Sequence, residues 1–304
     1  MMHKPVDYIA ERIEVLNPMH GKKLRKNLVS FDNAYYELAD GFFERYLGIL
    51  RSEGKTLDYA IDCYLQMIAD MNSETVEFLR SGKYTSSTFQ EVNERVYARP
   101  EIMEYYMHGL ILSQFLWKHH YGMFDYFITH FPKYARSAKT YLEVGVGHGF
   151  LLSKAIAILD VTTRVTAVDI SETSIKLAKS FVNNDRVDYR LQDILTFDDD
   201  RKFDFIVLGE VLEHVEQPLE LLVKLHGLLA PDGVFYFTTP TNAPAIDHIY
   251  LFNTVDEVRD MVERAGFHVE SELFLPSEDV SPERAAKFKI AMLYGAFLTK
   301  RSRD

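Results

Sequence analysis

Two acidic side chains and a histidine fall within five residues, in the run Glu210-Val-Leu-Glu-His214. If this run enters a helix, spacings of three and four residues place Glu210, Glu213 and His214 near one another on one face. Two carboxylates beside an imidazole could transfer protons in catalysis, or they could hold a divalent metal ion. The turn could instead only pack against and cap the helix that follows, so three roles stay open.

A second histidine, His248, lies in the run Thr239-Pro-Thr-Asn-Ala-Pro-Ala-Ile-Asp-His248, after the next apolar stretch. Loops that follow neighbouring parallel strands meet at the same edge of a sheet. His248 could therefore complete a metal site with Glu210, Glu213 and His214. A Mg, Mn, Zn or Fe ion there would bind two vicinal oxygens of a substrate and lower the pKa of a hydroxyl group.

A glycine-rich run, Tyr141-Leu-Glu-Val-Gly-Val-Gly-His-Gly-Phe150, closes another apolar stretch that is typical of a buried strand. Its three glycines would let the chain turn sharply into a helix, so that a ligand meets bare backbone at the helix N-terminus. Asp169 ends the next apolar stretch, at a distance where an acid can accept hydrogen bonds from ribose hydroxyls. The run and Asp169 together predict a ligand that carries adenosine. His148, inside the run, is expected to be only a spacer.

The elements that position these residues change in character near residue 136. Apolar residues recur at helical spacing over residues 7–133, and breaks at residues 17–18, 52–54, 81–87 and 99–100 predict five or six helices. His119 and His120 lie on one of these helices, where adjacent side chains diverge by about 100°, so at most one is expected to face a cleft. A packing or surface role is favoured for both.

After residue 139 strands alternate with helices, which is typical of a parallel sheet wrapped by crossover helices. Helices are predicted at 171–182, capped by Ser171, and at 254–265, where Thr254 and Glu257 form a capping box before Gly266 ends the helix. We therefore predict an α-helical region over residues 1–135 that covers the substrate, and an α/β domain over residues 136–304. Its seven strands are placed at 140–146, 164–170, 187–193, 203–209, 233–239, 268–275 and 291–299.

The composition, 304 residues with 47% hydrophobic residues and a formal net charge of −11, is that of an ordinary globular protein. The negative charge disfavours nucleic acid as a partner, because affinity for it depends on cationic contacts to phosphate. No segment has the roughly 20 apolar residues that span a bilayer. The single cysteine, Cys63, suits a reducing compartment. We expect a cytoplasmic protein without a membrane partner, and we leave a homodimer open.

The compressed spacing Gly-x-Gly-x-Gly, preceded by Glu143, resembles motif I of the class I S-adenosylmethionine-dependent methyltransferases. The resemblance covers about residues 138–300 and includes Gln192-Asp-Ile194, Leu208-Gly-Glu210 and Leu228-Leu-Ala-Pro-Asp-Gly233. It implies a Rossmann-like seven-stranded sheet of order 3-2-1-4-5-7-6 with an antiparallel last strand. It implies S-adenosylmethionine as the cofactor, held by Glu143, Gly145, Gly147, Gly149, Asp169, Ile170, Asp193, Ile194 and Glu210.

The Glu-x-x-Glu-His run resembles that of ubiquinone-pathway O-methyltransferases, of metal-dependent 2′-O-methyltransferases that act on small RNAs and, without a metal, of coclaurine-type N-methyltransferases. We expect methyl transfer to a hydroxyl of a small molecule, with His214, Glu210 and Glu213 as catalytic residues. N-methylation without a metal is the alternative. A non-catalytic methyltransferase-like binding subunit is the alternative of another class, and a nicotinamide dehydrogenase is the other enzyme to consider. The identity of the acceptor is not encoded in any motif.

Overall fold

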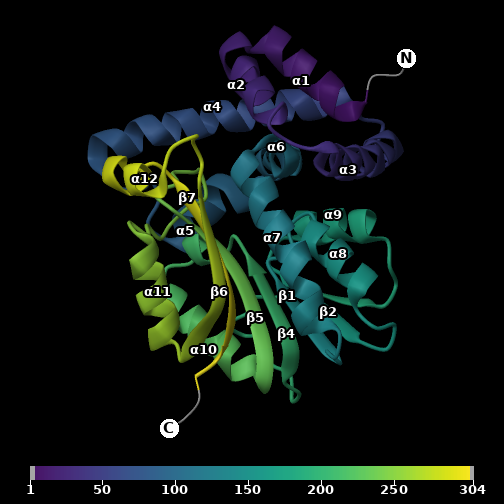
Figure 1. Ribbon diagram of the computed structural model, residues 1–304, viewed down its shortest axis with the longest axis vertical. Helices are drawn as coiled ribbons and strands as arrows, with labels where there is room; N and C mark the ends of the chain where they lie inside the picture. Colours follow the sequence, from purple (N-terminus) through teal and green to yellow (C-terminus); the bar gives the residue numbers. More distant parts are fainter. Residues whose placement is uncertain (1–3, 302–304) are drawn as a thin grey trace.

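The computed structural model describes residues 4–301, and its helical part lies above one end of the sheet (Figure 1). Residues 4–135 form seven α-helices, one more than the upper number predicted, and each predicted break falls between two elements. The elements are α1 (Pro5–Leu16), α2 (Pro18–Leu28), α3 (Asn33–Ser52), α4 (Leu57–Ser81), α5 (Phe89–Val92), the π turn η1 (Asn93–Tyr97), α6 (Pro100–Leu116) and α7 (Lys118–Ala135). Within the described range, no helix combines the length and apolar character needed to cross a membrane.

The boundary between α6 and α7 carries no proline or glycine. Trp117 has extended backbone there (φ −102°, ψ 124°), and its indole Nε1–H donates a hydrogen bond to the hydroxyl of Tyr64 at 2.8 Å. Because Tyr64 lies on α4, a tertiary contact accompanies the break between α6 and α7. Local sequence therefore could not predict this boundary.

The sheet contains seven strands in the order β3-β2-β1-β4-β5-β7-β6, which confirms the predicted fold. Strand β7 runs antiparallel to both of its neighbours, and the other pairs are parallel. Most strand ends differ from the prediction by one or two residues, but β5 begins four residues earlier. The strands are β1 (Thr140–Val144), β2 (Arg164–Asp169), β3 (Val187–Leu191), β4 (Phe203–Gly209), β5 (Leu229–Thr241), β6 (Phe267–Pro276) and β7 (Met292–Lys300).

Helices connect the strands as predicted, with one difference in capping. Ser171 accepts the Ser174 N–H at the start of α9, and Thr254 accepts the Glu257 N–H at the start of α11. The Glu257 carboxylate, however, accepts from the amide of Asn253, so the reciprocal half of the capping box does not form. The elements are α8 (Phe150–Ile158), α9 (Glu172–Val182), the 3-10 turn η2 (Leu212–His214), α10 (Pro218–Leu228), α11 (Val255–Arg264) and α12 (Pro282–Phe288).

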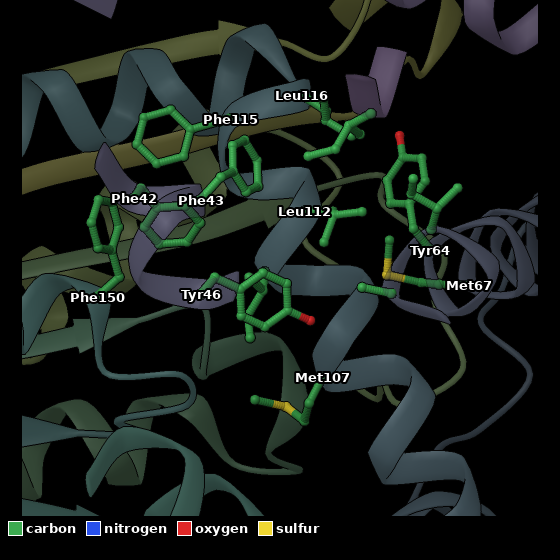
Figure 2. Packing of buried hydrophobic residues seen from close by; sticks show 14 of the residues in the cluster. Phe42, Phe43, Tyr46, Tyr64, Met67, Met107, Leu112, Phe115, Leu116 and Phe150 are labelled. Atoms are coloured by element: carbon green, nitrogen blue, oxygen red, sulfur yellow. The ribbon is translucent and has the colours of Figure 1, made fainter. Parts of the chain in front are cut away.

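One hydrophobic cluster joins the helical part to the start of α8. Phe150, the first residue of α8, is surrounded by Phe42 of α3, Phe115 of α6 and Phe124 of α7, with ring centroids 4.5, 5.5 and 4.3 Å away. Figure 2 shows Phe42, Phe43 and Phe115 gathered beside Phe150. Because Phe150 follows the glycine run directly, the packing of the helical part fixes where the glycine run ends.

Candidate active site

A cavity of about 1070 Å³ lies where the strand ends of the sheet meet α2, α4, α6 and α7. It collects residues that follow the first five strands, which is where an open α/β sheet binds its ligand. Of the site residues predicted from sequence, all but Gly149 line this cavity. Those that do are Glu143, Gly145, Gly147, Asp169, Ile170, Asp193, Ile194, Glu210, Glu213, His214 and His248.

The glycine loop presents bare backbone to the cavity at Gly147. Its φ is +52°, and a Cβ built there would meet only the Gly145 carbonyl oxygen, 3.9 Å away. A side chain at Gly147 would therefore be strained and would occupy open space beside the loop. Gly149 has a different role, because a Cβ there would lie 3.0 Å from the Cα of Ala178 on α9. Gly149 therefore allows close packing of α8 against α9, and its predicted contact with the cofactor stays a prediction.

Asp169 couples the glycine loop to the end of β2. Its carboxylate accepts the Gly147 N–H at 3.2 Å and the Ser171 N–H at 2.8 Å, and burial raises its pKa. The neighbouring side chain of Ile170 is 48% exposed at the cavity wall. After β3, Asp193 accepts the Leu195 N–H at 2.8 Å beside the buried Ile194. Two acids and two aliphatic side chains therefore line the same cavity, a combination that suits adenosine.

Glu143 is buried on β1 at the base of the glycine loop. The hydroxyl of Tyr141 donates to its carboxylate at 2.5 Å, and burial raises the pKa of Glu143 to about 8. The cavity therefore contains a carboxyl group that is mostly protonated at neutral pH. A cationic ligand group nearby would favour its ionised form.

The turn after β4 differs from the predicted helix. Glu210 has a left-handed backbone (φ +53°), held because its amide donates to Thr238, and only Leu212–His214 form a short 3-10 turn. A non-glycine residue in this region costs about 1–3 kcal/mol, which is a strain typical of functional sites. The Glu210 Oε1 atom is buried without a hydrogen-bond partner, and burial raises the pKa of this residue to about 7.

Glu213 is the most buried acid of the site, with 1% of its surface exposed. Its Oε2 accepts from the Thr239 hydroxyl at 2.9 Å, whereas Oε1 has no hydrogen-bond partner and lies 3.6 Å from Nε2 of His214. Burial, together with the negative charges of Glu210 and Asp247, raises its pKa well above the usual range. A proton or a bound cation would therefore stabilise the unpaired Oε1 atom of Glu213.

The protonation pattern of the two histidines follows from their partners. Nδ1 of His214 lies 2.9 Å from the carbonyl oxygen of Asp247, and Nδ1 of His248 lies 2.6 Å from that of Ala243. A carbonyl oxygen can only accept, so in the neutral rings both Nδ1 atoms carry the hydrogen and both Nε2 atoms keep a lone pair. The rings are 4.9 Å apart and nearly perpendicular.

Three of the four predicted metal ligands come together. Glu213, His214 and His248 each offer one ligand atom, and these atoms all lie within 4.8 Å of one another. Both histidines donate their other N–H to a backbone carbonyl, as metal-bound histidines do. Glu210 does not belong to this group, because its left-handed backbone removes it from the face that a helix would have given. The donor set fits a divalent ion with three protein ligands.

Several cavity residues were not predicted to contribute to the site. Asp247, Tyr97 and Tyr106 form hydrogen bonds around His214, and the adjacency of Asp247 to His248 was the one sequence signal among them. His119 and His120 both line the cavity, whereas their adjacency on a helix led us to expect at most one. His148 lines it as well, and burial lowers its pKa to about 4.

Comparison with known proteins assigns most of the second half of the chain. The model of the family described as "Methyltransferase domain" matches residues 116–272. A ubiquinone biosynthesis O-methyltransferase of Xanthomonas campestris pv. campestris (strain B100) is 31% identical over 158 residues, which are 51% of this chain and 64% of that protein. Its counterpart in Coxiella burnetii (strain RSA 331 / Henzerling II) is 33% identical over 143 residues, 46% and 59% of the two chains. The chain thus spans less than two thirds of the length of these relatives.

A solved structure shares the fold. The N-methyltransferase NodS from Bradyrhizobium japonicum WM9, in complex with S-adenosyl-L-homocysteine, superposes with a TM-score of 0.51. The match covers 71% of this chain and all of NodS, at 17% sequence identity. At this identity the likeness establishes the fold alone.

Proposed function

Because the chain belongs to the family of S-adenosylmethionine-dependent methyltransferases, we propose that it transfers the methyl group of that donor to a hydroxyl oxygen of a small molecule. The proposal rests on one observation: the residues expected to hold the methyl donor and the residue expected to accept a proton line the same cavity. We call these two groups of residues the two half-sites. Gly147 and Asp169 form a cradle for the donor, and His214 offers a lone pair for a proton in the same space.

The chemistry needs little beyond alignment and proton transfer. S-adenosylmethionine carries a methyl group already activated on a sulfonium, so the protein must hold a nucleophile in line and accept its proton. Nε2 of His214 is the acceptor that the hydrogen-bond pattern leaves free, and the Glu213 carboxylate 3.6 Å away would stabilise the imidazolium that forms. Glu210, directly after β4, is proposed both to bind the methyl donor and to act as a catalytic residue toward the acceptor.

The cavity favours a small, largely apolar acceptor. At about 1070 Å³ it is slightly larger than the usual range of small-molecule sites, about 300–1,000 Å³, so it has room for a donor and an acceptor together. Six of the ten methionines of the chain line it, and methionine adapts to irregular apolar shapes. These are Met19, Met71, Met103, Met107, Met123 and Met292. The relatives named as O-methyltransferases support oxygen over nitrogen.

A metal-assisted version of the reaction has its own support in the site. Glu213, His214 and His248 would hold the ion, which would lower the pKa of the acceptor hydroxyl. In that case His214 is a ligand, and the proton leaves through another group. N-methylation by His214 without a metal needs the same residues and is distinguished only by the acceptor.

Two measurements test the proposal. Calorimetry with S-adenosylhomocysteine should show binding at micromolar concentration, and absence of binding would contradict the donor assignment. Methyl transfer from labelled donor to a panel of phenols, catechols and amines should favour the oxygen acceptors. Activity that is lost with chelator and restored by Mg²⁺, Mn²⁺ or Zn²⁺ would establish the metal version, and full activity in chelator would exclude it. Failure across the panel with intact donor binding would favour a non-catalytic subunit.

The remaining expectations rest on composition and pattern. The division at residue 135, the cytoplasmic location, the homodimer and the absence of a nucleic-acid partner stay predictions. The acidic net charge of −11 supports the last of them.

A further inference from the structure

A tyrosine from the helical part reaches the centre of the site. Tyr97 ends the π turn η1, and its hydroxyl oxygen lies 3.2 Å from Nδ1 of His214. The amide of Ala98 donates to the Asn93 carbonyl at 2.8 Å and closes this turn, and the Phe89 amide donates to the Glu216 carboxylate at 2.8 Å. The segment before α6 is therefore tied to the turn after β4, and Tyr97 is held in place beside the catalytic candidate.

The hydrogen of the Tyr97 hydroxyl is left without an acceptor. Nδ1 of His214 has a single hydrogen, and the Asp247 carbonyl oxygen at 2.9 Å requires it. Tyr97 cannot donate to a nitrogen that itself donates, so its oxygen can only accept a share of that hydrogen. Within residues 4–301 no other group lies within hydrogen-bond reach of this hydroxyl. Tyr97 is half-buried and lines the cavity, so an acceptor for this hydrogen must come from the cavity side.

A tyrosine hydroxyl, with an ordinary pKa of about 10, carries its hydrogen at neutral pH. The negative charges of Asp247, Glu213 and Asp169 act on Tyr97. Asp169 belongs to the donor cradle, whereas Glu213 and Asp247 surround His214. Tyr97 lines the same cavity, so its free O–H bond is available to a ligand held between the two half-sites.

Resting on the proposed methyl transfer, we propose that Tyr97 is a specificity-determining residue whose hydroxyl donates a hydrogen bond to the methyl acceptor. The acceptor would then carry a second lone-pair atom, oxygen or nitrogen, close to the hydroxyl that is methylated. The hydroxyl that is methylated would lose its proton beside His214. The second atom would accept a hydrogen bond from the Tyr97 hydroxyl. The proposed role of Tyr97 depends on its contact with Nδ1 of His214. The role is therefore the same whether Nε2 of His214 accepts a proton or binds a metal ion.

The experiment compares two probes that differ by one oxygen. Catechol and phenol are titrated by calorimetry into full-length protein saturated with S-adenosylhomocysteine. The wild type should bind catechol more tightly than phenol. Tyr97→Phe should weaken catechol binding about tenfold, the loss expected for one hydrogen bond of about 1.4 kcal/mol, and should leave phenol binding unchanged. Tyr105→Phe is the matched control, because the Tyr105 hydroxyl donates to Asp70 and does not line the cavity.

Each outcome decides a different point. Equal catechol affinity in the wild type and Tyr97→Phe would overturn the role of Tyr97, as would an equal loss for catechol and phenol, which indicates a structural effect. If the wild-type complex binds neither catechol nor phenol, the proposed class of acceptor is wrong, whereas the assignment of the methyl donor is unaffected. Failure to bind S-adenosylhomocysteine in the first titration would instead overturn the proposed function, and with it this inference. The Nδ1–H form of His214, observed by ¹⁵N NMR, should persist in Tyr97→Phe.

Discussion

Asp169 Oδ2 accepts a hydrogen bond from the Gly147 amide at 3.2 Å, across 22 residues of sequence. This contact makes the acid at the end of β2 part of the glycine loop. The same carboxylate also accepts from Ser171, so its two oxygens hold two backbone segments together. The position of the glycine loop therefore depends on Asp169.

Replacing Asp169 should weaken donor binding. Hydrogen bonds to a charged group contribute about 1.5–3 kcal/mol, so Asp169→Ala should reduce affinity for S-adenosylhomocysteine by about 10- to 100-fold in calorimetry. Asp188→Ala is the control, because Asp188 is an exposed residue of β3 that pairs only with Arg190. Equal affinities in the two variants would contradict the ribose role of Asp169.

Gly147→Ala should lose donor binding as well as stability. The left-handed backbone makes the substitution cost about 1–2 kcal/mol, and the new methyl group would occupy the face where the donor lies. Gly41→Ala, at an exposed position inside α3, should instead stabilise the protein by about 0.5–1 kcal/mol. Thermal unfolding and donor titration measure the two effects separately. Unchanged affinity in Gly147→Ala would place the donor elsewhere.

A bound divalent ion should raise the melting temperature of the wild type and not that of His248→Ala. Binding to the folded state alone stabilises by about 2.7 kcal/mol when the ion is present at a hundred times its dissociation constant. Glu210→Gln is the matched control, since Glu210 lies outside the group formed by Glu213, His214 and His248. If the ion raises the melting temperature of His248→Ala as much as that of the wild type, it binds at another site.

The contribution of Glu143 and Glu210 to stability without ligand should fall as the pH rises from about 5 to about 8. In the unfolded chain a glutamate loses its proton near pH 4.5, whereas folding raises the pKa of Glu210 to about 7 and of Glu143 to about 8. Between these values the two carboxyl groups bind more protons in the folded state than in the unfolded chain, so their contribution to the free energy of unfolding decreases with pH. Histidines such as His148, whose pKa burial lowers to about 4, contribute in the opposite direction. The difference in stability between Glu143→Gln and the wild type should therefore change with pH in thermal unfolding measured at several pH values. A slope identical to that of the wild type would show that Glu143 is ionised in the folded protein.

The alternation of strands and helices predicted the seven strands, and the family resemblance supplied their order. The largest error in a strand end lies at β5, where Pro231-Asp-Gly233 has the composition of a turn. In the structure Leu229 pairs with Phe203, and the register then shifts before Phe205 pairs with Val234. The turn-forming residues lie inside β5 as an irregularity. Only the pairing of β5 with β4 shows that the strand begins before them.

The conformation of the glycine loop was predictable from the sequence, and the arrangement around His214 only in part. Gly147 and Asp169 belong to a local motif whose backbone conformation is encoded by neighbouring residues. Glu210 was misplaced because its left-handed backbone is imposed by Thr238 of the next strand. Tyr97 reaches His214 from 117 residues away, so no local pattern could identify it.

The aromatic packing around Phe150 limits how the two halves of the chain can be inherited. A segment that begins at residue 116, where the family match starts, would lack Phe42 and Phe115 and would expose Phe150 and Phe181. Recombination that brought in the helical half of a relative would need rings of the same size at the same depth. A change in the size of Phe42 or Phe115 would therefore call for a matching change at Phe150, in the other half of the chain.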